Sequence, residues 1–338
     1  MKAMILDRPA SASRAPLRME TLPDPRPEAH EVAIAVSACG VCRTDLHLVE
    51  GEIVPPAYPV VPGHEVVGTV EAVGDAVRDL EPGDRVGVAW VGRFCGTCPF
   101  CRDGRENLCE DPTFTGFHRN GGYAERITAD ARFIHPIPDA LGDDEAVAPL
   151  LCAGIIGYRA LKQSGLRPGR SVALYGFGGA AHIALQVAAA WECEVFVVSR
   201  TQASRERARN LGADWVGAPG EKPPHPVDHA VTFAPAGAVI PGALENLRAG
   251  GTLSIAGIYL DRVPELDYDR HLFRERALVS TTANTREDAR ELLALAGEFG
   301  FRTDIEVVPL KDANDALRRL KEDALDAQAA VLRVRNRH

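Results

Sequence analysis

Residues 171–182, SVALYGFGGAAH, decide the fold of the second half of the chain. The apolar segment Ser171–Tyr175 has the length and composition of a buried strand, and it runs directly into a glycine-rich turn. After that turn, small and apolar residues recur at helical spacing as far as Trp191. The turn itself has the spacing G-x-G-x-x-A, formed by Gly176, Gly178 and Ala181, and Gly179 lies within it as a further candidate cofactor-binding residue. A strand, this turn and a helix in succession predict a βαβ unit whose helix N-terminus faces the phosphates of a dinucleotide.

The same alternation of strands and helices continues downstream. Helical patterns separate most of five further strand-like segments: Glu194–Val198, Trp215–Val216, Asp228–Phe233, Thr252–Ala256 and Ala277–Ser280. Six strands in alternation with helices predict an α/β fold with a doubly wound parallel sheet, a Rossmann dinucleotide-binding domain over residues 154–286.

The remaining residues differ in composition and in the length of their apolar runs. Residues 1–153 are rich in Gly, Pro and short apolar runs, which predicts strands separated by turns. Helical patterns at about 287–299 and 313–320 and a strand at 330–334 follow the Rossmann segment. We assign residues 1–153 and 287–338 together to a mainly β catalytic domain, although periodicity alone cannot place the C-terminal elements.

Composition excludes several classes of protein. The 338 residues are 46% hydrophobic and 25% charged, as expected for two ordinary globular domains. A net charge of -9 disfavours nucleic acid and anionic membranes as partners. Asp7 and Arg8 interrupt the N-terminus, and His, Gln, Glu or Arg interrupts every other long apolar stretch. We therefore expect neither a signal peptide nor a membrane span but a soluble cytoplasmic protein. Most of the eight cysteines are clustered, which favours metal ligation in a reducing compartment over a disulfide framework.

Four of these cysteines form one local motif. The stretch CGTCPFCRDGRENLC has the pattern C-x2-C-x2-C-x7-C, formed by Cys95, Cys98, Cys101 and Cys109. Such short spacings let one loop surround a single ion, and four thiolates with no open position predict a structural zinc site in a lobe at about 92–112. An iron–sulfur cluster also uses four thiolates, but its usual spacings differ.

A second group of metal-ligand residues is spread through the chain. Residues 39–47 read CGVCRTDLH, residues 63–77 read GHEVVGTVEAVGDAV, and Cys152 lies in APLLCAG. Together with the four-cysteine lobe, these motifs make the chain resemble the zinc-containing medium-chain alcohol dehydrogenases, within them the bacterial and cinnamyl-alcohol-type branches. The resemblance extends from residue 1 to about 334 and implies a GroES-like fold for the catalytic domain.

The resemblance implies a role for each motif. Cys42, His64 and Cys152 would bind a catalytic zinc ion with one open position, a donor set known for catalytic zinc. Thr44 would take the hydroxyl proton of the substrate and His47 would relay it to solvent, while Asp45 and Glu65 would orient His64 and modulate the ion. Arg43 would contact the cofactor pyrophosphate, and the active site would lie in the cleft between the domains. Trp90 and Ile53 would line an apolar substrate pocket, and Cys39 and Cys193 would be packed thiols.

The end of the second Rossmann strand bears on the choice of cofactor. NAD-binding domains usually place a carboxylate there to bind the ribose 2′-hydroxyl, but this chain has Ser199, followed by Arg200 and Arg205. A serine and two guanidinium groups can bind a 2′-phosphate, so we expect NADP(H) in preference to NAD(H). The alternatives are that both arginines are solvated helix charges or that the enzyme accepts both cofactors.

These inferences converge on an NADP-dependent zinc alcohol dehydrogenase or aldehyde reductase with two zinc ions per chain. Its substrates would be primary or secondary alcohols and the corresponding aldehydes or ketones, and it would form a dimer or tetramer, as related bacterial enzymes often do. Four features depart from the family pattern. Ile156 stands where relatives often have threonine, Ile53 replaces an aromatic residue of small-alcohol relatives, Ala181 is the third glycine of the turn, and the ribose carboxylate is missing. The alternatives are a polyol-type dehydrogenase and a catalytically silent NADPH-binding zinc protein.

Overall fold

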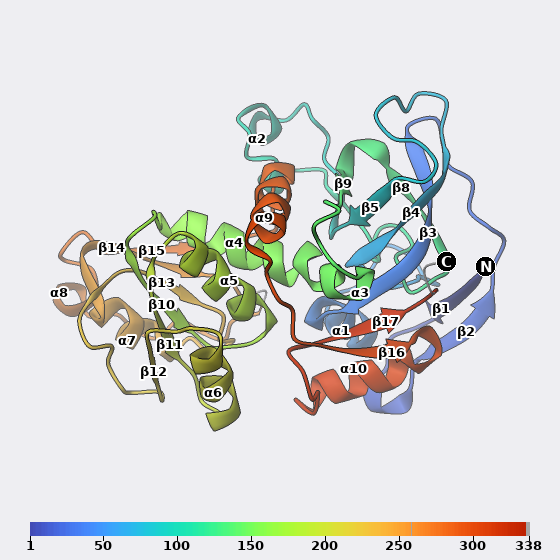
Figure 1. Cartoon of the computed structure of the whole chain (residues 1–338). Helices are drawn as coiled ribbons and strands as arrows, with labels where there is room; N and C mark the ends of the chain where they lie inside the picture. The colour runs from blue at the N-terminus through green and yellow to red at the C-terminus, as the bar shows by residue number, and fades with distance from the viewer. Residues whose placement is uncertain (258, 336–338) are drawn as a thin grey trace. The chain divides into compact units, whose positions relative to one another are not determined.

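The computed structural model describes residues 1–257 and 259–335 and divides into two compact units (Figure 1). The first unit consists of Met1–Cys152 and Ala283–His338, and the second consists of Ala153–Thr282. The first unit is therefore assembled from both ends of the sequence, whereas the second is one continuous segment.

The second unit is built on a parallel sheet of six strands in the order β12-β11-β10-β13-β14-β15. The strands are β10 (Ser171–Tyr175), β11 (Glu194–Val198), β12 (Trp215–Gly217), β13 (Val227–Thr232), β14 (Leu247–Ile255) and β15 (Ala277–Ser280). The order reverses direction beside β10, and this switch point is where doubly wound sheets bind ligands.

Helices cover both faces of this sheet. Ile240 and Leu244 of α7 (Val239–Glu245) share one core cluster with Ala173 and Phe196. Because side chains alternate along a strand, the buried Val172 faces the opposite side of the sheet. There α4 (Ala153–Ser164) packs on α5 (Gly179–Ala190). The remaining helices of the unit are α6 (Gln202–Asn210) and α8 (Tyr268–His271).

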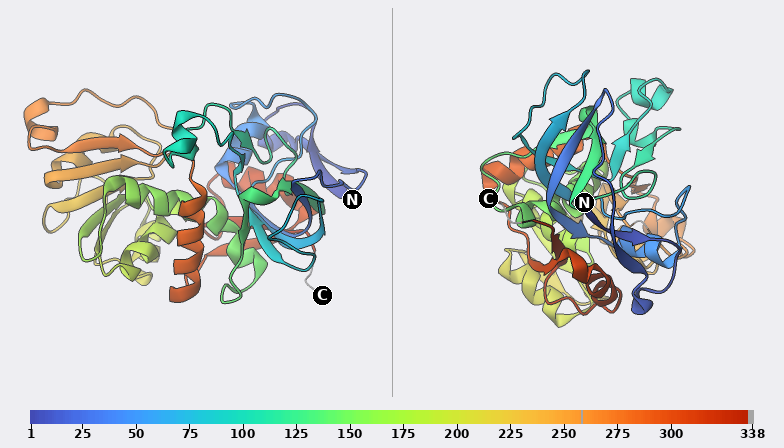
Figure 2. Two further views of the ribbon diagram at one scale, coloured as in Figure 1. Left: turned by 90° about the horizontal axis from the view of Figure 1, so that it is seen from above. Right: turned by 90° about the vertical axis from the view of Figure 1, so that its right-hand side faces the viewer.

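The first unit contains a mostly antiparallel sheet of seven strands, whose curvature is visible in Figure 2. The order is β16-β17-β3-β4-β5-β9, with β8 also paired to β3. The bounds are β3 (Glu31–Val41), β4 (Val66–Val73), β5 (Arg85–Val88), β8 (Arg126–Asp130), β9 (Ile134–Pro136), β16 (Ile305–Pro309) and β17 (Ala329–Arg333). Strand β3 is central and mostly buried, and it packs its apolar side chains into a core that includes Tyr123 and Leu48.

Smaller elements complete the first unit. Two short sheets pair β1 (Lys2–Leu6) with β2 (Leu17–Thr21) and β6 (Val91–Arg93) with β7 (Thr113–Phe114). The helices are α1 (Arg43–Glu50), α2 (Pro99–Arg102), α3 (Asp144–Val147), α9 (Arg286–Phe299) and α10 (Ala313–Lys321). Single 3-10 turns are η1 (Ala12–Arg14), η2 (Glu106–Leu108), η3 (Ala131–Phe133), η4 (Ala148–Leu151) and η5 (Leu310–Asp312).

The structure confirms the predicted fold class, a doubly wound parallel sheet together with a mainly β domain. Every strand expected between residues 171 and 280 is present. The sequence pattern of β14 starts at Thr252, but the strand itself begins five residues earlier, at Leu247. The C-terminal elements that periodicity could not place belong to the first unit, where β17 pairs with β3. None of the helices among the described residues is long and apolar enough to cross a membrane.

Candidate metal and cofactor sites

Cys42 lies at the junction of β3 and α1, where the buried central strand turns into a helix. It is the N-cap of α1 and keeps an extended backbone, with φ of -107°. The helix therefore begins with Arg43, and Thr44 and Asp45 lie in its first turn. One sharp change from strand to helix thus places several polar side chains beside the Cys42 thiol.

Asp45 connects two distant segments at this junction. Its Oδ2 accepts a hydrogen bond of 3.0 Å from the Cys42 backbone N–H, as in a helix capping box. Its Oδ1 accepts the Gly63 N–H at 3.0 Å and lies 3.2 Å from Nδ1 of His64. The carboxylate is buried, so it favours the tautomer of His64 that carries its proton on Nδ1. His64 Nε2 is then a free lone pair directed away from Asp45.

The three predicted ligands of a catalytic metal lie together. Sγ of Cys42 is 3.7 Å from Sγ of Cys152, which follows η4. Two thiolates on one tetrahedral zinc ion, each about 2.3 Å from it, lie about 3.8 Å apart. His64 Nε2 is buried and has no hydrogen-bond partner among the described residues. A zinc ion satisfies that nitrogen and both sulfurs, so the residues present fit the metal.

Glu65 is a fourth possible ligand of this cluster. One of its carboxylate oxygens lies within 4.8 Å of the ligand atoms of Cys42, His64 and Cys152. Residue 40 beside Glu65 must be glycine, because a Cβ atom at Gly40 would lie only 1.7 Å from Glu65 Oε2. Burial, followed by the nearby Cys42 thiolate, raises the pKa of Glu65 well above its usual range. The carboxylate is therefore close enough to occupy the position that a substrate oxygen would need.

The two sulfurs of this cluster differ in their acidity. A hydrogen bond from Cys152 holds the pKa of the Cys42 thiol well below its usual value. The same contact, together with burial, raises the pKa of Cys152. Without a metal the pair therefore shares one negative charge, and a bound dication favours loss of the second proton.

The predicted proton-relay residues lie along α1. The buried Thr44 hydroxyl is 3.7 Å from Cys42 Sγ, so it borders the metal cluster. His47 is one turn further along the helix and its side chain is 21% exposed, which brings the ring to the surface. Its Nδ1 contacts the carboxylate of Glu52, a residue that the sequence analysis did not identify. Motif matching could not find Glu52 because it follows the helix in a turn with no family signature.

Trp90 lies beside the metal cluster within an aromatic group. Its ring meets His64 edge-to-face with centroids 5.1 Å apart and stacks on Phe114 at 4.7 Å. Phe117 extends the group, 5.9 Å from Trp90. Ile53 is partly buried and packs against the main core of the first unit. Phe114, in the short strand β7, and Phe117, in the turn after it, were missed because single aromatic residues outside a motif carry no sequence signal.

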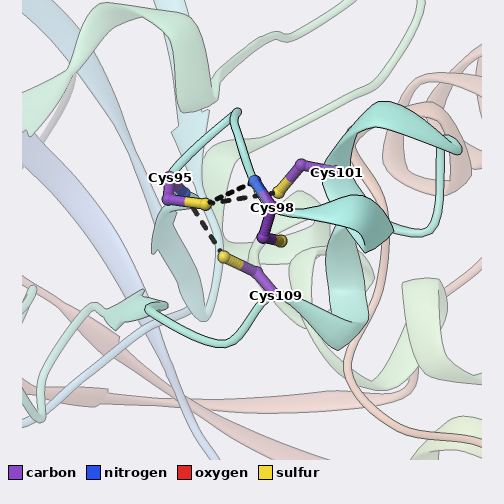
Figure 3. A group of neighbouring side chains, drawn as sticks. All are labelled: Cys95, Cys98, Cys101 and Cys109. Atoms are coloured by element: carbon purple, nitrogen blue, oxygen red, sulfur yellow. Dashed lines mark hydrogen bonds between the residues drawn. The ribbon is translucent and has the colours of Figure 1, made fainter.

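The four cysteines of the lobe converge on one point, as Figure 3 shows. Sγ of Cys95 and Cys101 lie 3.9 Å apart, again close to the spacing of two thiolates on one zinc ion. Backbone N–H groups of Thr97 and Cys98 donate to Cys95, and they lower the pKa of that thiol to about 6. The N–H of Cys95 donates in turn to Cys109 Sγ at 3.3 Å. The backbone therefore stabilises the Cys95 thiolate, whereas burial raises the pKa of the Cys101 thiol to about 12, and a bound metal ion would have to displace that proton.

Ionic and apolar contacts attach this lobe to the rest of the first unit. Glu106 of η2 accepts two side-chain bonds from Arg286, at 2.7 Å from Nη2 and 3.1 Å from Nε. Arg286 begins α9, and its guanidinium also lies 4.8 Å from the centre of the Phe133 ring. Val91, Phe94, Phe133 and the buried Cys109 form a small core beneath the loop.

In the second unit, the glycine-rich turn has the conformation that its sequence requires. Gly176 has φ of +88°, a left-handed conformation that favours glycine. Gly178 is the N-cap of α5 and has no side chain to cap the helix, while a Cβ there would meet no atom within 4 Å. Gly179 begins the helix, and Ala181 is fully buried against the sheet. The N-terminus of α5 therefore has no capping side chain, as in turns that bind a phosphate at a helix N-terminus.

Ser199, Arg200 and Arg205 lie together after β11, but they are not equivalent. Ser199 is buried and Arg200 is exposed. Arg205 directs Nη1 at the backbone carbonyls of Ser199 and Arg200, each at 2.7 Å. Arg205 thus fixes the turn with part of its guanidinium, while Arg200 is the cation that projects into solvent.

Arg43 has an ionic partner within the first unit. Its Nη2 lies 2.5 Å from Oδ1 of Asp323, which follows the end of α10. Asp323 lies 280 residues away in the sequence, so no local pattern connects it with Arg43.

Comparisons with known proteins identify the family of the chain. The family model of the alcohol dehydrogenase GroES-like domain matches residues 28–139, and that of the zinc-binding dehydrogenases matches residues 179–298. The probable alcohol dehydrogenase AdhA of Mycobacterium tuberculosis is 46% identical over 99% of this chain and 97% of its own length. An alcohol dehydrogenase of Geobacillus stearothermophilus is 36% identical over 99% of this chain and 100% of its own length.

A solved structure gives the same result. The cinnamyl alcohol dehydrogenase SbCAD4 of Sorghum bicolor superposes with a TM-score of 0.86 at 28% identity, covering 98% of this chain and 97% of that one. Both units of the present fold are thus matched by relatives of nearly equal length. The chain belongs to the zinc-containing medium-chain alcohol dehydrogenases.

Proposed function

We propose that this alcohol dehydrogenase uses NADP(H) to interconvert primary or secondary alcohols with aldehydes or ketones, and that it binds two zinc ions per chain. The observation that carries the proposal is the cluster of Cys42, His64 and Cys152, with sulfurs 3.7 Å apart and an unpartnered buried His64 Nε2. Two cysteines and one histidine leave a fourth position for a substrate oxygen, as catalytic zinc sites do.

The chain's own residues would prepare this position. When bound there, zinc supplies a Lewis acid that lowers the pKa of an alcohol oxygen and so eases loss of its proton. The two thiolates balance the charge of the ion, and Asp45 holds the imidazole of His64 in one orientation. Glu65 lies within reach of the same position, so it must give way when a substrate oxygen enters.

The proton would leave along α1. The Thr44 hydroxyl takes it from the substrate oxygen, and His47 transfers it towards solvent. His47 suits this role because its ring is partly exposed while Glu52 holds its Nδ1. Each of these assignments can be tested by a single substitution.

The preference for NADP(H) is supported by the turn after β11. Ser199 replaces the acidic residue that would repel a 2′-phosphate, and the exposed Arg200 offers a guanidinium for charge-assisted hydrogen bonds. Arg205 supports the turn through its two bonds to backbone carbonyls. The glycine turn before α5 would bind the pyrophosphate.

The substrate would be larger than acetaldehyde. Trp90, Phe114 and Phe117 form an aromatic surface beginning at the metal ligand His64, and apolar or aryl side chains pack well on such a surface. Ile53 is smaller than the aromatic residue of small-alcohol relatives, which leaves additional room. A series of aldehydes of increasing chain length should therefore give kcat/KM values that rise beyond acetaldehyde, and a maximum at acetaldehyde would contradict this assignment.

The decisive experiment combines zinc analysis with a cofactor comparison. We expect two zinc ions per purified chain, one for each ligand group, and a higher kcat/KM with NADPH than with NADH. Arg200→Asp should lower kcat/KM for NADPH by about tenfold to a hundredfold and leave NADH nearly unaffected, because a charge-assisted hydrogen bond is lost. Arg209→Asp makes the same charge change near the end of α6 and serves as the control. Equal use of both cofactors by the wild type rejects the NADP preference, and absence of turnover with either rejects the catalytic assignment.

The enzyme would function as a homo-oligomer. Four of its large exposed hydrophobic side chains fall between β14 and β15: Tyr259, Val263, Tyr268 and Phe273. They precede the edge strand β15, whose sequence ALVS carries no charge to discourage pairing with another chain. The mass in solution tests this proposal, and a monomer at micromolar concentration would reject it.

A further inference from the structure

We propose that a groove of the first unit, between residues 56–60 and the loop 117–120, is a binding site for a small organic carboxylate with an apolar body. The groove encloses about 380 Å³, within the range of about 300–1,000 Å³ that is typical of small-molecule sites. All the described residues that line it belong to the first unit, and none of them is a predicted metal ligand. The inference is therefore independent of the proposed function.

One wall of the groove is apolar and firmly held. Phe117, Val60 and Ile127 line it, and the last two of these are buried. Val60 exchanges two backbone hydrogen bonds with Leu6 of β1, at 2.9 and 3.1 Å, so this wall is fixed before a ligand arrives. The aryl or branched aliphatic body of a small molecule can pack on such a surface.

Two polar side chains of the lining are left with hydrogen-bond donors only. His118 Nδ1 accepts the backbone N–H of Phe114 at 3.1 Å, and partial burial lowers the pKa of His118. The neutral ring therefore carries its proton on Nε2. Asn120 Oδ1 accepts the N–H of Val61 at 3.0 Å, which leaves the two N–H bonds of its amide nitrogen. In both side chains the acceptor is used within the protein, and N–H groups remain for a ligand.

Two arginines add N–H groups to the same lining. Arg119 contacts the buried carboxylate of Glu31 through Nη2, and its other N–H groups have no hydrogen-bond partner among the described residues. Arg126 is paired with Glu71 and Asp24, so it contributes less. None of the described residues that line the groove is an aspartate or a glutamate.

A set of N–H donors beside an apolar wall favours one class of ligand. A carboxylate has only acceptors, it can bind several N–H groups at once, and charge-assisted hydrogen bonds of this kind are the stronger ones. A carboxamide or an amine would place N–H groups of its own against these donors. The neighbouring carboxylates balance the charge of the arginines, so hydrogen bonds, rather than net charge, would determine the selectivity.

The loop that provides these donors also contacts the metal cluster. A Cβ atom at Gly121 would lie 2.0 Å from the carbonyl oxygen of Gly63, so the two backbones touch directly beside His64. The Phe117 ring lies 5.9 Å from that of Trp90, which in turn meets His64. A ligand packed on Phe117 should therefore change the surroundings of Trp90, and tryptophan fluorescence can report its binding.

The test uses benzoate as the probe and measures its dissociation constant by calorimetry, with tryptophan fluorescence as a second signal. For the zinc-loaded wild type we expect a dissociation constant on the order of a millimolar, as a ligand of this size allows. Benzamide has a similar shape without the charge, and it should bind at least about tenfold more weakly because charge-assisted hydrogen bonds are lost. Equal binding of the two probes would contradict the selectivity for carboxylates.

A matched pair of variants locates the site. Ala57 is exposed and lines the groove, so Ala57→Glu should weaken benzoate binding by about tenfold or more through repulsion between like charges. Ala140→Glu makes the same change at an exposed position outside the groove and should leave the constant unchanged. The proposal is rejected if the wild type does not bind benzoate at about 10 mM. It is also rejected if Ala57→Glu binds the probe as well as Ala140→Glu does.

A third variant distinguishes the groove from the metal cluster, because benzoate can also bind to a zinc ion. Cys42→Ser removes a predicted metal ligand and no group of the groove, so it should still bind benzoate. Loss of benzoate binding in Cys42→Ser would reject the groove and leave the proposed function intact. Benzoate binding that persists in Cys42→Ser, in a protein whose wild type shows no turnover, would support the groove and reject the proposed function.

Discussion

The two cysteine clusters of this enzyme are built in opposite ways. The lobe takes its four sulfurs from one loop of 15 residues, and three of its four cysteines are partly exposed. The other cluster draws Cys42, His64 and Cys152 from three separate segments, and its histidine is buried. Local sequence alone can define the first site, whereas the second exists only once the first unit has folded.

The groups that surround the ligands also differ between the two clusters. In the lobe, backbone N–H groups donate to the sulfurs of Cys95 and Cys109. In the other cluster, buried carboxylates surround the ligands, because Asp45 holds His64 and Glu65 lies beside Cys42. The first arrangement suits a permanently closed site, and the second suits a site whose ligands must tolerate a changing fourth partner.

The largest expected effect is a loss of activity on substitution of one cysteine, and it distinguishes the functions of the two clusters. Cys42→Ser should lower kcat/KM by about a thousandfold or more, since several kcal/mol of charge stabilisation are lost, with one zinc ion lost per chain. Serine is a good N-cap, so α1 and the melting temperature should change little. Cys98→Ser is the matched change in the lobe, and it should also remove one zinc ion but lower thermal stability instead. If both variants lose activity and stability to the same extent, the division of roles is wrong.

The next largest effect concerns the stability of the protein in acid, which depends on one buried histidine. His135 of β9 is buried, and burial followed by the nearby Arg286 lowers its pKa from 6.5 to about 4. Below pH 6.5 the unfolded chain therefore takes up a proton that the folded chain does not, and stability falls as the pH decreases towards 4. The full loss is about 3 kcal/mol. Denaturant unfolding at several pH values should show a shallower acid dependence for His135→Gln than for the wild type.

Protonation of the thiolates in both clusters also destabilises the protein in acid, but it affects the wild type and the His135→Gln variant equally. Identical pH profiles would mean that the zinc sites, and not this histidine, determine acid stability.

A smaller effect tests the buried carboxylates. Asp45→Asn should weaken zinc binding at the catalytic cluster by about tenfold to a hundredfold, because partners that orient a ligating histidine typically contribute that much. Competition with a chelator, followed by zinc analysis, measures the change. The lobe zinc of the same variant provides an internal control, and equal weakening at both clusters would contradict the distinction drawn here.

The smallest effect concerns the attachment of the lobe. Glu106→Gln removes the ionic part of the contact with Arg286, whose side chain is 47% exposed. We expect a loss of about 1 kcal/mol or less, measured by denaturant unfolding, with activity retained. A loss of several kcal/mol would show that the lobe depends on this pair more than on its small apolar core.

The sequence predicted the Rossmann domain well because its signals are local. The alternation of strands and helices and the turn at Gly176 and Gly178 depend on residues close together in the chain. The pairing of β17 with β3 could not be predicted, since it joins residues about 290 positions apart and periodicity carries no information on partners. The residue types of the zinc cluster were recognisable from the motifs around Cys42 and His64. The contacts of Glu52 and Asp323 could not be recognised in the sequence, because each depends on where a separate turn ends.

The pairing of β17 with β3 also determines when the first unit can complete its fold during synthesis. Residues 330 and 331 lie opposite Val41 and Gly40, directly before Cys42, so this part of β3 lacks one of its neighbouring strands until β17 has left the ribosome. The second unit is continuous and can fold while translation proceeds, as N-terminal and contiguous domains generally do. A chain truncated before residue 329 would therefore release a folded nucleotide-binding domain attached to an incomplete zinc domain.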